Sequence, residues 1–271
     1  MAGNDVEGGL KSVASALDLL DCFLEEEELG VSDVARRLGV AKSTAHRLLT
    51  TLASRGIIEQ NAANGRYRLG LHLFELGHLA LERVELRRRS KSLLEQLRQA
   101  SGWTVHLSIV QAADTLFLER LTTLRGMEAI QRYRRRWPLH TTSSGKALCA
   151  YDPVALQSRI AAGFPAFTPH TISCEQDFRA EIASVRRMGF ATSREELMPG
   201  LASVAAPVLD AHGIAVAAIS ITGSADELGE HPDRQARLVL AATKRLSQVM
   251  STRPHDPSEN GKAGVPASGT A

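Results

Sequence analysis

Two short amphipathic helical segments joined by a tight turn constrain this chain more than any other feature of its sequence. In residues 32–38 the apolar residues fall on one helical face, and Gly39 opens the turn Gly39-Val40-Ala41. Glycine favours such a turn because it readily adopts the left-handed backbone that ends helices. From Ser43 to about Ala53 a second apolar stripe follows at helical spacing. We predict a helix-turn-helix, with Ser32 and Ser43 as N-caps.

Segments on both sides extend this pair of helices to a small domain over residues 11–70. Upstream, Val13, Leu17 and Leu20 recur at helical spacing after Ser12, which we predict as the N-cap of a first helix. Downstream, residues 57–60 and 66–69 read as two short strands around a loop of Asn, Ala and Gly residues, as in a hairpin. The expected architecture is a winged helix-turn-helix.

Charge is distributed unevenly along the chain. Residues 1–30 hold one basic and eight acidic residues, a net charge of −7, whereas residues 31–69 hold seven basic and two acidic, a net charge of +5. The segment 86–138 is also basic, with eleven basic and four acidic residues, a net charge of +7. A basic helix-turn-helix suits the phosphates and the major groove of double-stranded DNA. Winged helices also serve as protein-interaction modules, and this alternative stays open.

The candidate DNA-binding residues lie at the start of the second and third helices and on the wing. We expect Arg47 to contact a guanine, the Ser32 hydroxyl and nearby helix amides to contact a phosphate, and the wing arginines to reach the backbone or minor groove. The full set is Ser32, Lys42, Ser43, Thr44, His46, Arg47, Arg66 and Arg68.

Residues 71–101 predict a single linker helix, because they contain no proline and Leu79, Leu86 and Leu93 recur every seventh residue. The repeat is short, so we expect a limited dimerising contact. Residues 102–251 then alternate between strand and helix patterns, with hairpins joining the strands near Thr104 and Thr115 and those near Ala202 and Ile214. This predicts an α+β domain with a mainly antiparallel sheet.

The remaining strand predictions are residues 128–133 and 190–194, and the helices are predicted near 145–151, 153–162, 176–188 and 233–250. Residues 1–10 and 252–271 are polar and rich in glycine or proline, and we predict that both are disordered.

Composition bounds the class of protein. Of the 271 residues, 44% are hydrophobic and 23% charged, as in globular domains, and the length corresponds to about one and a half to two domains. No apolar stretch approaches the roughly 20 residues that cross a bilayer, and no basic-then-apolar leader is present, so we expect a cytoplasmic protein with no membrane contact. Three widely spaced cysteines predict reduced thiols.

Enzyme motifs are incomplete. Gly145-Lys146 lacks the upstream glycine and following Ser or Thr of a phosphate-binding loop. Ser143 to Lys146 spells S-x-x-K, but the S-D-N and K-T-G motifs of penicillin-recognising hydrolases are missing from the sequence. The histidines show no metal-ligand spacing. We therefore expect no catalytic residues, no metal and no cofactor.

Three stretches of the sequence resemble the IclR family of bacterial transcription regulators. Residues 12–70, with SVASALDLLDCF, VSDVARRLGVAKSTAHRLLTTLASRGII and GRYRLG, are similar to its DNA-binding domain. LHTTSSGKALCA at 139–150 and GFATSREELMPGLASVAAPVLDAHGIAVAAISITG at 189–223 are similar to two signature stretches of its effector-binding domain. The resemblance covers roughly residues 12–250.

The resemblance implies a GAF-like C-terminal domain that binds a small organic acid, aromatic acids included, and a homodimer or dimer of dimers on a palindromic operator. The implied effector-binding residues are Ser143, Ser144, Gly145, Ser203, Ser220 and Thr222. The backbone amides at Gly145 and the hydroxyls of Ser143 and Ser144 are expected to form a cradle for a carboxylate.

These expectations combine into a ligand-responsive regulator of a catabolic operon, acting as repressor or activator. In it, the state of the effector domain sets the spacing of two DNA-reading helices through the linker helix. The rival hypothesis is a sensory or catalytic GAF-like protein whose helix-turn-helix binds another protein.

Overall fold

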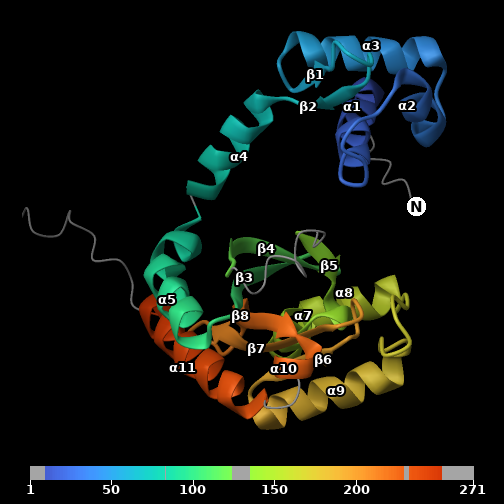
Figure 1. The fold of residues 1–271 in the computed structure, drawn as a ribbon. Coiled ribbons are helices and arrows are strands. Elements are labelled where there is room, and N and C mark those ends of the chain that lie inside the picture. The colour runs from blue at the N-terminus through green and yellow to red at the C-terminus, as the bar shows by residue number, and fades with distance from the viewer. Residues whose placement is uncertain (1–9, 83, 124–134, 229–231, 252–271) are drawn as a thin grey trace, which may run out of the picture. The chain divides into compact units, whose positions relative to one another are not determined.

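The computed structural model describes residues 10–82, 84–123, 135–228 and 232–251, and the chain divides into two compact units, residues 1–84 and 85–271 (Figure 1). The two tails predicted to be disordered lie outside the described residues, apart from Leu10. In the described part of the chain, no helix is both long and apolar enough to cross a bilayer.

The first unit is a winged helix-turn-helix, as predicted. Its elements are α1 (Lys11–Cys22), α2 (Val31–Leu38), α3 (Lys42–Ser54), β1 (Ile58–Gln60), β2 (Tyr67–Leu69) and α4 (Leu71–Glu82). Leu19, Val34 and Leu49, one from each of the first three helices, are fully buried in a shared core. Gly39 ends α2 with a φ of 64°, the left-handed conformation that its residue type favours. The strands pair antiparallel, with Ile58 opposite Leu69.

Each of the three predicted serine caps lies two residues beyond the actual N-cap position. The N-cap positions are Leu10, Gly30 and Ala41, and no side chain of these residues caps its helix. Ser12, Ser32 and Ser43 lie instead inside the first turns of α1, α2 and α3. At α2 the reason is visible, because the Asp33 carboxylate accepts a hydrogen bond from the Gly30 N–H at 3.1 Å and caps the helix from its third residue.

The predicted linker helix is also wrong in one respect. Instead of one helix over residues 71–101, the structure has α4, ending at Glu82, and α5 (Glu85–Ser101), which belongs to the second unit. On α5 the buried residues are Ser90, Leu94 and Leu97, because this helix packs against the sheet and the last helix of its own unit. The seven-residue leucine repeat therefore does not form one continuous buried seam.

The second unit is built on a six-stranded antiparallel sheet in the order β5-β4-β3-β8-β7-β6, which confirms the predicted sheet type. Its strands are β3 (Thr104–Gln111), β4 (Asp114–Leu121), β5 (Arg136–Pro138), β6 (Ala191–Arg194), β7 (Leu201–Leu209) and β8 (Ala215–Ser224). Both predicted hairpins are present, and β5 was not expected. The strand predicted at 128–133 lies outside the described residues.

Helices cover both faces of this sheet (Figure 1). α5 and α11 (Pro232–Ser251) pack together and against the central strands, and α7 (Ser143–Tyr151) packs on β7 and β8. Neighbours on β7 such as Val204 and Ala205 point to opposite faces and are both buried, so neither face is open there. The short helices η2 (Leu139–Thr141) and α10 (Ala225–Leu228), with α8 (Pro153–Ala162) and α9 (Glu175–Met188), complete the unit.

The core of the first unit yields a direct prediction. Leu19→Ala removes a fully buried side chain and is expected to destabilise the unit by about 2–5 kcal/mol, from lost burial and the cavity left behind. Leu17 lies on the same helix with 59% of its surface exposed, so Leu17→Ala is the matched control. Hydrogen exchange of the α3 amides measures both variants. Equal acceleration of exchange by the two substitutions would contradict the packing described here.

Candidate DNA-reading helix and buried polar site

α3 presents a polar face because its apolar residues are taken up by the core. Ala45 and Leu49 are fully buried, whereas Lys42, Ser43 and Thr44 are exposed, as are His46 and Arg47. The Thr50 and Thr51 hydroxyls further along α3 donate to backbone carbonyls of the same helix. The structure thus places together, on one accessible helix, the five candidate residues that the sequence assigned to it.

One flank of α3 also borders a hollow between α1 and α3 with a volume of about 580 Å³. Thr44 and Arg47 line it, together with apolar side chains that include Leu17, Leu20 and Leu48. Arg47 is therefore an exposed residue that borders an apolar surface.

The two wing arginines are engaged within the unit. The Arg66 guanidinium donates to the Asp33 carboxylate at 2.9 Å and to the Glu28 carbonyl at 3.0 Å. Arg68 donates to the Glu59 carboxylate at 2.6 Å across the two strands. Ser32 is exposed in the first turn of α2. The sequence predicted Arg66 as a DNA contact but did not reveal its ion pair with Asp33, because Asp33 lies 33 residues away in sequence.

In the second unit, buried polar residues align across the strands. Ser193 on β6 pairs with Ser203 on β7, Ser203 with Thr222 on β8, and Thr222 with Thr104 on β3. Directly paired residues of antiparallel strands share a face of the sheet, so these four side chains form one row. A neighbouring row contains Ser220, opposite His106 on β3. We call these two rows the polar face.

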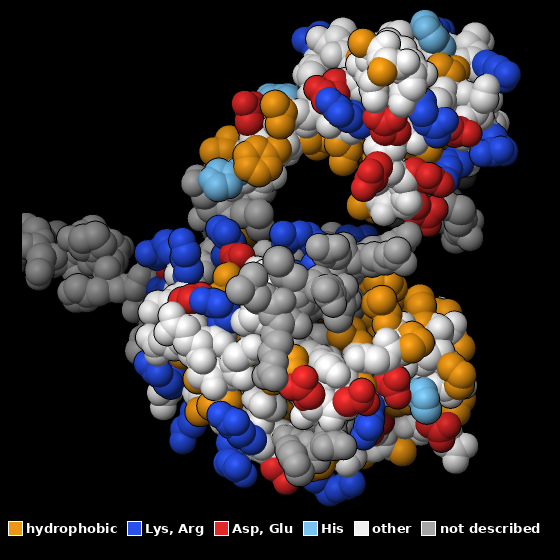
Figure 2. All heavy atoms as spheres, in the orientation of Figure 1, with side chains coloured by type: hydrophobic (Ala, Val, Ile, Leu, Met, Phe, Trp, Pro, Cys, Tyr) orange, Lys and Arg blue, Asp and Glu red, His pale blue; other side chains and the backbone are white. Residues whose placement is uncertain are grey.

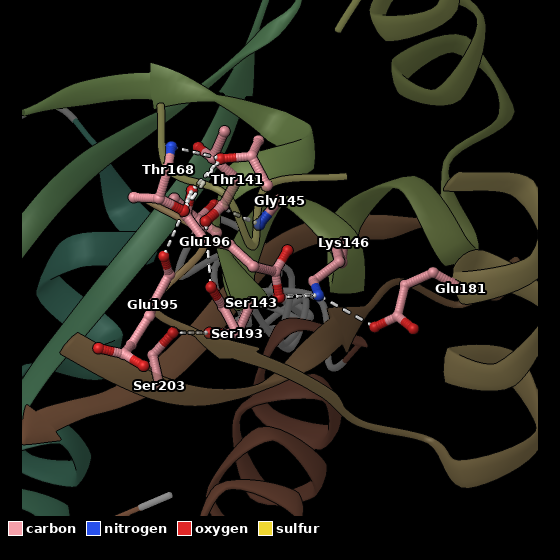
Figure 3. A network of polar contacts seen from close by, with 12 residues as sticks. Thr141, Ser143, Gly145, Lys146, Thr168, Glu181, Ser193, Glu195, Glu196 and Ser203 are labelled. Atoms are coloured by element: carbon pink, nitrogen blue, oxygen red, sulfur yellow. Dashed lines mark hydrogen bonds and ion pairs between the residues drawn. The ribbon is translucent and has the colours of Figure 1, made fainter. Parts of the chain in front are cut away.

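The N-terminus of α7 lies against the polar face (Figure 3). The Ser143 and Ser203 hydroxyls are hydrogen-bonded at 2.7 Å, and Ser193 donates to the Thr141 carbonyl at 3.1 Å. Ser108 on β3 donates to the Ser144 hydroxyl at 3.2 Å. Ser220 and Thr222 lie two apart on β8 and share this face, as expected. The structure therefore brings the family-implied residues 143, 203, 220 and 222 to one buried region.

In this structure the backbone amide of Gly145, part of the predicted carboxylate cradle, is engaged within its own helix. The Gly145 N–H already donates to the Thr142 hydroxyl at 3.0 Å, as an N-cap bond of α7. A Cβ at position 145 would collide with the backbone of Leu139, so close packing is what requires a glycine here.

Lys146 forms a buried ion-pair cluster that the sequence did not reveal. Its side chain is 2% exposed, and the Nζ atom donates to Glu196 at 2.8 Å and to Glu181 at 3.0 Å (Figure 3). Burial raises the pKa of Glu196, and the Lys146 ammonium opposes this rise. The Thr168 hydroxyl donates to the Glu195 carbonyl at 2.6 Å, which further anchors the segment after β6. The cluster thus ties α7, α9 and this segment together.

Two histidines near the site are held neutral. Burial lowers the pKa of His106 to about 3, helped by the positive charges of Arg120 and Arg135, and the ring contacts Phe117 with centroids 4.6 Å apart. Burial likewise lowers the pKa of His140 to about 4. His106 thus offers hydrogen-bonding nitrogens rather than charge on the polar face. No group of three or more potential metal-binding side chains occurs among the described residues.

These features define a class: a winged helix-turn-helix protein with a separate α+β unit that encloses a buried polar site. The comparisons with known proteins give the family. Residues 12–62 match the "IclR helix-turn-helix domain", and residues 78–248 match "Bacterial transcriptional regulator IclR C-terminal". The chain belongs to the IclR family.

Relatives of known sequence and structure agree. The chain is 38% identical over 217 residues to the glycerol operon regulatory protein of Streptomyces coelicolor, covering 80% of this chain and 85% of that protein. A solved IclR regulator from Silicibacter sp. TM1040 is 29% identical, with a TM-score of 0.75, covering 90% and 98% of the two chains. An IclR homolog from Microbacterium hydrocarbonoxydans, solved with 4-hydroxybenzoate, is 25% identical, with a TM-score of 0.74 and coverage of 89% and 99%.

The family membership decides between the two hypotheses drawn from the sequence. The matching domains and relatives are transcription regulators, so the protein is a DNA-binding regulator and not an enzyme.

The buried cluster yields a prediction about stability. Lys146→Met leaves two carboxylates without their cation, which is expected to cost about 3–5 kcal/mol at pH 7. Without the ammonium, the pKa of Glu196 rises further above its unfolded value. Protonation of Glu196 at low pH then favours the folded state. As the pH rises from 5 to 7, the free energy of unfolding of the variant should therefore fall more than that of wild type.

The chain offers a selective probe and a control for this measurement. Both tryptophans, Trp103 and Trp137, belong to the second unit, so tryptophan fluorescence reports its unfolding in urea. Lys91→Met removes the same charge from an exposed position on α5 and should have little effect. An unchanged stability of the Lys146 variant at both pH values would refute the role of the cluster.

Proposed function

We propose that this protein regulates a catabolic operon by binding a palindromic operator as a homodimer or dimer of dimers, and that a small organic acid controls this binding. The observation that carries the proposal is the exposed polar N-terminal half of α3 on a winged helix-turn-helix, in a chain that also has the family's effector-binding domain. Whether regulation is repression or activation depends on the position of the operator.

On the DNA side, the geometry supports α3 as the element that enters the major groove. The first residues of a recognition helix lie nearest the base edges, and here they are Lys42, Ser43 and Thr44, followed by His46 and Arg47. Arg47 is the residue we assign to a guanine, because a guanidinium can form two hydrogen bonds to its O6 and N7 atoms. Ser32 and Arg68 are assigned to the flanks of the contact, and Arg66, which is bound to Asp33, supports the wing there.

Exposed apolar side chains on α4 support self-association. Leu71, Phe74, Leu76 and Leu79 are between 47% and 78% exposed, and Figure 2 shows hydrophobic side chains gathered along this helix. A contiguous exposed apolar surface of this kind marks a contact with another protein. A second copy of the chain satisfies it in a two-fold dimer, which also matches a palindromic operator.

On the effector side, the polar face and the start of α7 support a ligand with several hydrogen-bonding groups. Ser143, Ser203, Ser220 and Thr222 supply hydroxyls, and the neutral ring of His106 adds a hydrogen-bonding nitrogen. The relative solved with 4-hydroxybenzoate supports an organic acid, aromatic acids included, as the class of effector. A ligand that favours one state of the regulator by about 1–3 kcal/mol changes operator affinity about 5- to 150-fold.

The DNA-reading role of Arg47 can be measured. Arg47→Ala is expected to weaken operator binding by about 1–3 kcal/mol and to reduce the preference for operator over scrambled duplex, because a base contact is lost. Arg55→Ala removes the same charge just beyond the other end of α3 and should weaken binding to both duplexes alike. Fluorescence anisotropy titrations give both affinities. If Arg47→Ala leaves discrimination intact, the assignment is wrong.

The effector site can be tested separately. Ser203→Leu fills the polar face with an apolar side chain and is expected to abolish the effect of the ligand while leaving operator affinity unchanged. Ser92→Leu, on an exposed position of α5, is the control. Thermal-shift assays with a panel of small carboxylic acids, including 4-hydroxybenzoate, identify a ligand that stabilises wild type. An undiminished shift in the Ser203 variant would place the effector elsewhere.

A further inference from the structure

The tip of the wing is held by one carboxylate. Residues 61–66 connect β1 to β2, and both asparagines of this loop donate their side-chain amides to Glu28, which lies just before α2. Asn61 Nδ2 is 2.8 Å from one carboxylate oxygen, and Asn64 Nδ2 is 2.7 Å from the other. Each oxygen of Glu28 thus accepts one asparagine.

The same asparagines organise the loop backbone. Asn61 Oδ1 accepts the Ala63 N–H at 3.0 Å, and Asn64 Oδ1 accepts the Arg66 N–H at 2.9 Å. An amide side chain has one accepting and one donating end, so holding the amino ends at Glu28 directs both carbonyl ends at the loop. Glu28 therefore fixes the orientation of both side chains that shape the wing tip.

A second carboxylate holds the base of the wing. Asp33 Oδ2 accepts the Arg66 guanidinium at 2.9 Å and the Gly30 N–H at 3.1 Å, so it joins the wing to the first turn of α2. Between the two carboxylates, Leu29 and Tyr67 exchange backbone hydrogen bonds of 2.8 and 2.9 Å. The segment 28–33 is thus bonded to the wing along its length.

Carboxylates on a DNA-binding module normally weaken DNA binding, because they repel phosphates. Glu28 and Asp33 are only partly buried, so their charges are not hidden from solvent. Hydrogen bonds from Asn61 and Asn64 lower the pKa of Glu28, and the Gly30 N–H lowers that of Asp33, so both stay ionised at neutral pH. Removing either carboxylate would relieve its repulsion of the DNA phosphates, but it would also remove the hydrogen bonds that hold the wing.

We propose that Glu28 and Asp33 are positioning residues for DNA binding, which set the wing so that its tip and Arg68 meet the duplex, and that Arg66 acts through Asp33 rather than on a phosphate. This inference rests on the proposed contact between the wing and DNA. Neutralising either acidic residue should therefore weaken operator binding, although the change removes a negative charge from a DNA-binding surface.

The test for Glu28 uses the full chain and an operator duplex at low salt. Glu28→Gln places an amino group against one of the asparagine amino groups, and operator affinity is expected to fall about three- to tenfold. Glu27→Gln is the matched control, since Glu27 is exposed and makes no hydrogen bond or ion pair with the residues that the structure describes. Its removal should leave affinity equal or slightly higher.

A charge-neutral rescue separates hydrogen bonding from electrostatics. In the double variant Glu28→Gln with Asn64→Asp, the glutamine amino group can donate to the new carboxylate, whose other oxygen still accepts the Arg66 N–H. The net charge equals that of wild type, and affinity is expected to return to within about twofold. If Glu28→Gln lowers operator affinity and the double variant does not restore it, the proposed hydrogen-bond mechanism is overturned.

A double-mutant cycle tests the Arg66–Asp33 pair. Asp33→Asn and Arg66→Gln should each weaken binding, and the two together should weaken it no more than the stronger single change, because both break one interaction. If Arg66 contacted a phosphate independently, Asp33→Asn would tighten binding and the effects would add.

Arg47→Ala in the same assay reports on the proposed function. Weak binding by that variant, with unchanged or tighter binding by Glu28→Gln, would reject the positioning role alone.

Discussion

The burial of one side of α3 is the constraint on which the DNA-binding unit depends. Ala45 and Leu49 pack with no exposed surface against residues of α1 and α2, such as Leu19 and Val34. A helix held along one stripe must expose the opposite side, and in this chain that side carries the basic and hydroxyl residues. The turn at Gly39 brings α2 and α3 together at the angle that this packing requires.

The second unit is organised by a different kind of contact. There, polar residues lie inside the fold, and several form hydrogen bonds with distant segments, as with Ser143 and Ser203 or Lys146 and Glu196. A buried polar group without a partner is costly, so such contacts specify one arrangement of α7 over the sheet. The same requirement makes this region suited to a ligand that offers hydrogen bonds of its own.

Local sequence patterns predicted most of the fold because they report local physics. The apolar period, the left-handed turn at Gly39 and the asparagine-glycine loop of the wing each depend on residues close in sequence. What the sequence left hidden depends on distant pairs. Asp33 pairs with Arg66, and Lys146 pairs with Glu181 and Glu196, although the partners lie 33 to 50 residues apart in sequence. The interruption of residues 71–101 likewise arises because α5 packs within the second unit. Of the candidate sites, the positions on α3 were predictable, whereas the occupied amide of Gly145 was not.

The central claim is that α3 reads a specific duplex while the second unit holds a metabolite that changes this affinity. The most direct measurement is a titration of the purified full-length chain with the duplex upstream of its own gene, at low ionic strength, with and without the acid that stabilises it thermally. We predict binding well above that to a scrambled duplex, with an affinity shifted at least about fivefold by the acid. Equal affinity for both duplexes, whether or not the acid is present, would contradict the account.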